Sequence, residues 1–129
     1  MKTSNTKQLV SKLLISLFFL FSASNLLAHA KSETSDPAAR SVLSHSPEAI
    51  KIVFSEQLEP AYSTIIVKGK DSKSVTEEKA TVDPDNNKRL LLKLPNLSAG
   101  KYTVYYKVLS VDGHVVKSKY SFRIKEVSH

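Results

Sequence analysis

The segment Ser110-Val111-Asp112-Gly113-His114 places a carboxylate and an imidazole two residues apart. Residues 101–109 before it and 114–124 after it alternate in polarity and are rich in β-branched and aromatic side chains, which is typical of β-strands. Side chains at positions i and i+2 of an extended segment point to one face, and glycine permits a sharp bend. We therefore expect Asp112 and His114 to bind one metal ion, with a third ligand supplied from elsewhere in the chain.

The beginning of the chain has the pattern of a secretory signal. Three lysines precede a short apolar run at residues 13–21, and small residues follow it. The run is shorter than the roughly 20 residues that a membrane-spanning helix needs. We predict that residues 1–28 are a cleaved signal peptide and that residues 29–129 form the mature, exported domain.

The position of cleavage decides whether His29 can be the third ligand. A cut after Ala28 makes His29 the first residue, so that its free α-amino group and a ring nitrogen can chelate one metal ion. A cut after Ala30 also fits the pattern of small residues and would remove this ligand. The sequence leaves both positions open, and a histidine beside a cleavage site, taken by itself, is more often a bystander than a ligand.

Composition narrows the possible functions. The chain has 129 residues with three Gly, five Pro and no Cys, which indicates a single domain without disulfides. Removal of residues 1–28 leaves 16 basic residues against 12 acidic ones, a formal net charge of +4. The basic residues alternate with apolar ones along strands, which favours a solvated sheet face over a nucleic-acid site. No pattern typical of a hydrolase or a kinase is present.

The order of the expected elements indicates an all-β fold. A polar lead-in at 30–46 holds one expected edge strand, and a turn is expected at 83–87, where Asp, Asn and Pro cluster. Expected strands cover about 40–43, 49–56, 62–68, part of 74–82, 89–94, 101–109 and 114–124. About seven short strands at regular spacing, with no helical segment, predict a Greek-key β-sandwich.

Several of these segments together resemble the CopC family of periplasmic copper-resistance proteins. The resemblance rests on His29-Ala30-Lys31, Phe54-Ser55-Glu56, residues 97–104, the 110–114 segment and Tyr120-Ser121-Phe122. It implies an immunoglobulin-like β-sandwich or barrel that binds one Cu(II) ion per mature chain. It also implies a site made of His29, Asp112 and His114, a periplasmic location, and association with a CopD-type inner-membrane copper protein.

The sequence also departs from the family pattern. Some members hold Cu(I) at a second site made of methionines and a histidine, but here the only Met is Met1 and Val53 stands at the histidine position. Thioether ligands suit Cu(I), so we expect no Cu(I) site. Val115 and Ser118 replace a frequent Pro and a later Gly of the family, which affects the expected shape of the loop.

The other ionisable residues have simpler interpretations. We interpret His45 as solvent-exposed and His129 as part of a frayed chain end. Glu56 and Glu59 are interpreted as surface charges, and the five tyrosines as strand packing residues.

Three classes of function remain at this point. The first is a periplasmic Cu(II)-binding protein, not an enzyme, that sequesters copper or passes it to a membrane partner. The second is a copper monooxygenase, against which stand the absence of Trp and a carboxylate ligand that would fill a position oxygen chemistry needs. The third is an exported interaction module without metal, which is the outcome if cleavage falls after Ala30.

Overall fold

The structure, a computed structural model, describes residues 31–126, and within them eight β-strands account for the regular structure. The strands are β1 (Ser32–Asp36), β2 (Val42–Leu43), β3 (Ala49–Phe54), β4 (Thr64–Lys68), β5 (Thr81–Asp83), β6 (Asn86–Lys93), β7 (Gly100–Leu109) and β8 (Val115–Ile124). A single 3-10 turn, η1 (Pro60–Tyr62), lies between β3 and β4. None of the helical structure in residues 31–126 has the length and apolar character needed to cross a membrane.

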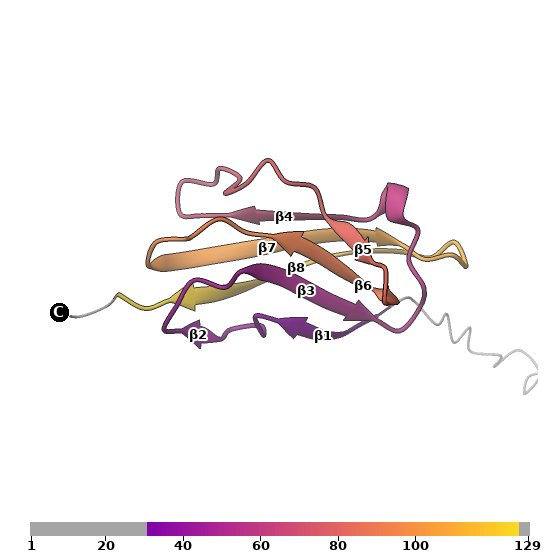
Figure 1. Cartoon of the computed structure of the whole chain (residues 1–129), viewed down its shortest axis with the longest axis horizontal. Helices are drawn as coiled ribbons and strands as arrows, with labels where there is room; N and C mark the ends of the chain where they lie inside the picture. The colour runs from indigo at the N-terminus through magenta and orange to yellow at the C-terminus, as the bar shows by residue number, and fades with distance from the viewer. Residues whose placement is uncertain (1–30, 127–129) are drawn as a thin grey trace, which may run out of the picture.

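The strands form two four-stranded sheets that pack face to face (Figure 1). The first, called the β3 sheet, has the order β1-β3-β6-β5, and the second, called the β7 sheet, has the order β2-β8-β7-β4. The longest pairing joins β7 and β8 in an antiparallel hairpin from Gly100 opposite Ile124 to Leu109 opposite Val115. The predicted Greek-key β-sandwich is therefore confirmed, with eight strands instead of about seven.

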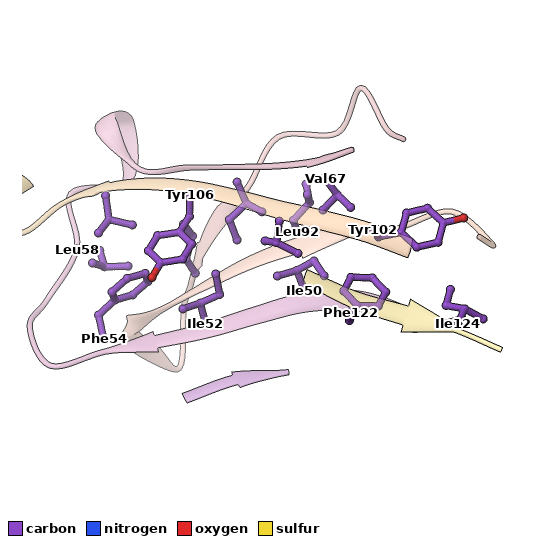
Figure 2. Packing of buried hydrophobic residues seen from close by; sticks show 14 residues of the cluster. Ile50, Ile52, Phe54, Leu58, Val67, Leu92, Tyr102, Tyr106, Phe122 and Ile124 are labelled. Atoms are coloured by element: carbon purple, nitrogen blue, oxygen red, sulfur yellow. The ribbon is translucent and has the colours of Figure 1, made fainter. Parts of the chain in front are cut away.

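Alternating side chains build the core between the sheets. Ile50, Ile52 and Phe54 on β3 are fully buried, while Lys51 between them is exposed. They meet residues of the β7 sheet, and Phe54 packs edge-on against Tyr106 with ring centroids 5.6 Å apart (Figure 2). Burying each such side chain contributes about 1.5–3 kcal/mol, so this core can hold the domain together without disulfides.

The first strand of the sheet was not predicted from the sequence. β1 has the sequence SETSD, which contains no apolar residue, and it was expected to be part of an extended lead-in. Pairing with β3, from Ser32 opposite Phe54 to Asp36 opposite Lys51, makes it an edge strand. Backbone hydrogen bonds to a neighbour therefore decide its structure, and a polar composition does not prevent them.

The remaining expectations hold with shifted boundaries. The expected edge strand near 40–43 is the short β2, which runs parallel to the end of β8. The weak strand expected within 74–82 forms only as β5. The predicted turn at 83–87 is the β5–β6 hairpin, with Asp83 opposite Asn86. Arg89 binds the Asp83 carboxylate at 2.8 Å across the base of that hairpin.

Candidate metal centre

The β7–β8 connection is a tight, hydrogen-bonded corner. Ser110 is 1% exposed, its N–H donates to the carbonyl of His114 at 2.9 Å, and its hydroxyl oxygen accepts from the N–H of His114 at 3.1 Å. The N–H of Gly113 donates to the carbonyl of Ser110 at 2.9 Å. Gly113 has a φ of +87°, a conformation that side chains with a Cβ rarely adopt.

The corner does not place Asp112 and His114 as an extended segment would. Asp112 and His114 were expected to share one face of an extended segment, but residues 111–113 form a turn and bend. Asp112 is exposed in that turn, whereas His114 is half-buried directly before β8. The alternation of faces along a strand therefore does not apply to this pair.

The imidazole of His114 pairs with a carboxylate from the segment that follows β3. Its Nδ1 lies 3.1 Å from Oε2 of Glu56, and the Glu56 side chain is 17% exposed. Metal-binding histidines commonly hold a carboxylate on one ring nitrogen, which fixes the ring and leaves the other nitrogen for the ion. The interpretation of Glu56 as a surface charge was therefore wrong. Its place in the Phe54-Ser55-Glu56 segment, one of those that carried the resemblance, was the signal that could have shown it.

Backbone hydrogen bonds fasten the segment that carries Glu56 to the corner. The N–H of Val111 donates to the carbonyl of Gln57 at 2.9 Å, and the N–H of Glu59 donates to the carbonyl of Leu109 at 2.8 Å. Leu58 and Ser110 form an antiparallel bridge between these two contacts. The chain leaving β3 and the β7–β8 corner thus meet at one end of the sandwich (Figure 1).

The first described residue lies at the same end. The N–H of Lys31 donates to the Ser55 hydroxyl at 3.0 Å, and the N–H of Ser55 donates to the carbonyl of Lys31 at 2.9 Å. Ser55 directly precedes Glu56. The chain therefore enters the sandwich beside the pair formed by Glu56 and His114.

The predicted ligands are only partly within the described residues. His114 and Asp112 lie at the corner, but His29 lies outside residues 31–126. Within 31–126, no group of three or more His, Cys, Asp or Glu side chains is arranged to hold a metal ion.

His45 lies at the opposite end of the molecule. It is exposed, as predicted, and lines a surface hollow together with Ala99 and Ile124. Ile124 ends β8, while His114 directly precedes that strand. Ten strand residues span about 30 Å, so His45 and His114 cannot bind the same ion.

Comparison with known proteins decides the family, since residues 32–125 match the CopC domain. The chain belongs to the CopC family. Over 99 residues it is 34% identical to Protein YobA of Escherichia coli (strain K12), covering 76% of this chain and 80% of that protein. Over 110 residues it is 31% identical to Copper resistance protein C of Escherichia coli, covering 80% of this chain and 86% of that protein.

Solved structures of the family share the fold. The crystal structure of CopC from Methylosinus trichosporium OB3b has a TM-score of 0.71 at 34% identity and covers 78% of this chain and 100% of that one. PcoC from Escherichia coli has a TM-score of 0.66 at 29% identity and covers 76% of this chain and 100% of that one. PcoC is a methionine-rich copper resistance protein, whereas this chain contains one Met.

Proposed function

We propose that this CopC-family protein is exported to the periplasm and binds one Cu(II) ion there as part of copper resistance. It acts by holding copper, not by catalysing a reaction, and either sequesters the ion or passes it to a CopD-type membrane protein. Membership of the family and the names of its relatives support the copper assignment. The paired His114 and Glu56 at the corner support the position of the site.

We propose His29, Asp112 and His114 as the ligands. The observation that carries this proposal is the pair of hydrogen bonds between Lys31 and Ser55 beside the corner. Two peptide units join His29 to Lys31, so their Cα atoms can be separated by no more than about 7.6 Å. Covalent geometry alone therefore keeps His29 within reach of the end of the sandwich where His114 lies.

The donor set suits Cu(II). Imidazole and amine nitrogens bind Cu(II) more strongly than they bind other divalent first-row metals. A carboxylate adds a negatively charged oxygen donor. If residues 1–28 are removed, His29 supplies both its α-amino group and its ring. Asp112, exposed in the turn, supplies the oxygen donor and fills a position that oxygen chemistry would need open, which argues against the monooxygenase alternative.

The N-terminus of the secreted protein is the first test of this proposal. Intact mass of the exported form should correspond to a chain that begins at His29. A chain that begins at Lys31 would contradict the copper site and favour the interaction module.

Cu(II) titration of purified variants is the second test. The chain that begins at His29 should bind one Cu(II), and either His114→Ala or a glycine added before His29 should abolish tight binding. Asp112→Asn should weaken binding without removing the nitrogen donors. His45→Ala is the matched control at the far end of the sandwich and should bind as the wild type does. Equal losses in His45→Ala and His114→Ala would show that the site lies elsewhere.

A further inference from the structure

The outer face of the β7 sheet carries a dense group of positive charges. Along β4, β7 and β8, residues that face the core alternate with residues that face outward. The outward positions include six cations, here called the basic face: Lys68, Lys101, Lys107, Lys117, Lys119 and Arg123. None of the 12 acidic residues of the chain lies in β2, β4, β7 or β8.

Four of the six cations of the basic face oppose one another directly across the strands. Lys107 lies opposite Lys117, and Lys101 lies opposite Arg123. Like charges in directly opposite positions destabilise a sheet. Within residues 31–126 none of the six cations forms an ion pair, since the two ion pairs found there join Arg89 to Asp83 and His114 to Glu56. These like-charged pairs therefore cost stability that no ion pair within residues 31–126 offsets.

An exposed apolar centre lies among these charges. The Tyr105 ring is 38% exposed and has the ammonium groups of Lys68 and Lys119 at 5.6 and 5.8 Å from its centroid. Ile66, 46% exposed, lies directly opposite Tyr105 on β4. The basic face thus combines its cations with an exposed aromatic side chain that lies among them and an aliphatic side chain on the edge strand β4.

We propose that the basic face binds the anionic phospholipid surface of a membrane. Charge complementarity requires an acidic partner, and a sheet face without acidic residues can lie along a broad negative surface. Five of the six cations are lysines, which are depleted in protein–protein interfaces but contribute strongly near anionic lipid headgroups. Tyrosine, with an apolar ring and a polar hydroxyl, suits the boundary between headgroups and water.

This docking would also orient the candidate metal centre. The β7–β8 corner closes the same two strands that carry most of the basic face, so a protein lying on that face holds the corner at the margin of the contact. The lipid proposal does not depend on copper binding. It can therefore be tested with copper-free protein.

Sedimentation with lipid vesicles tests the proposal. The wild type should bind vesicles made of equal parts phosphatidylglycerol and phosphatidylcholine and should not bind vesicles of phosphatidylcholine alone. Binding should weaken with added salt, because the screening length falls from roughly 30 Å at 0.01 M to about 8 Å at 0.15 M ionic strength. The triple variant Lys107→Gln, Lys117→Gln, Lys119→Gln should bind anionic vesicles about 100-fold more weakly.

Two further triple variants test whether vesicle binding depends on the charges of the basic face, and not on total charge or on misfolding of the variant. Lys51→Gln, Lys79→Gln, Lys93→Gln loses the same charge at exposed positions outside the β7 sheet and should bind nearly as the wild type does. Lys107→Arg, Lys117→Arg, Lys119→Arg keeps the charge of the face and should retain binding.

Equal losses in the two glutamine variants, or no binding of the wild type to anionic vesicles, would overturn the proposal. Binding of an acidic protein through the basic face, with no vesicle binding, would also overturn it and make the face a protein-docking surface.

Discussion

The imidazole of His114 and the carboxylate of Glu56 are 3.1 Å apart although 58 residues separate them in the chain. The contact joins the end of β3 in one sheet to the β7–β8 corner of the other. Hydrogen bonds of the 57–59 segment to Leu109 and Val111 hold the two backbones together. The fold itself therefore orients the ring of His114.

The first prediction concerns the role of that carboxylate. Glu56→Gln should lower the affinity for Cu(II) by about 10- to 100-fold, because it removes the charged partner that orients and polarises the imidazole of His114. Competition titration with a Cu(II) chelator measures the change. Glu59→Gln alters a half-buried neighbour that bonds the corner through its backbone N–H; it is the control and should bind normally. A loss as complete as that of His114→Ala would instead make Glu56 a direct ligand.

The sequence predicts the strands of this protein better than it predicts the site. Alternation identified β3, β7 and β8 because each buries one face, whereas β1 has no apolar residue and is set by pairing with a neighbour. Glu56 could not be joined to His114 from the sequence, because their contact depends on how the two sheets pack. Asp112 was placed on an extended segment because alternation says nothing about where a strand gives way to a turn.

The second prediction concerns the corner itself. Ser110→Ala should lower the free energy of unfolding by about 1–3 kcal/mol, because the N–H of His114 loses its acceptor at a buried position. Ser118→Ala, an exposed serine on β8, should change it by less than about 0.5 kcal/mol. Urea unfolding of both variants measures the difference, and equal effects would show that the hydroxyl of Ser110 does not stabilise the corner.

The third prediction concerns the pH dependence of copper binding. The proposed site combines an α-amino group with two imidazoles, and each must give up its proton before it can bind a metal. Affinity for Cu(II) should therefore fall as the pH is lowered from about 7 to 5, and copper loading near neutral pH should release protons. Calorimetry in two buffers of different ionisation enthalpy measures the protons released. An affinity that does not change with pH would contradict a site built from nitrogen donors.

The fourth prediction concerns the oxidation state of the bound copper. The chain after Met1 contains no Met and no Cys, so it lacks the soft sulfur donors that favour Cu(I). Under reducing conditions the protein should lose its copper to a Cu(I) chelator that leaves Cu(II)-loaded protein intact. Tight retention of Cu(I) would show that histidine and carboxylate donors alone can support such a site in this fold.

The fifth prediction concerns Tyr120, whose hydroxyl is buried and has no hydrogen-bond partner within residues 31–126. Burial raises the pKa of this hydroxyl well above its usual value, and the nearby Asp36 carboxylate adds to the shift. A raised pKa in the folded state means that the protonated form is favoured there. The stability that depends on a protonated Tyr120 is therefore complete below about pH 10 and is lost as the pH rises further.

Tyr120→Phe removes both the unpaired hydroxyl and its ionisation. At pH 7 the variant should be as stable as the wild type or slightly more stable, because no hydrogen bond is lost. Near pH 11 it should be more stable by about 1 kcal/mol, since only the wild type must keep Tyr120 protonated in order to stay folded. Urea unfolding at both pH values measures this, with Tyr62→Phe, which alters an exposed ring, as the control. If the two variants respond to alkali equally, burial of the Tyr120 hydroxyl is not what limits stability at high pH.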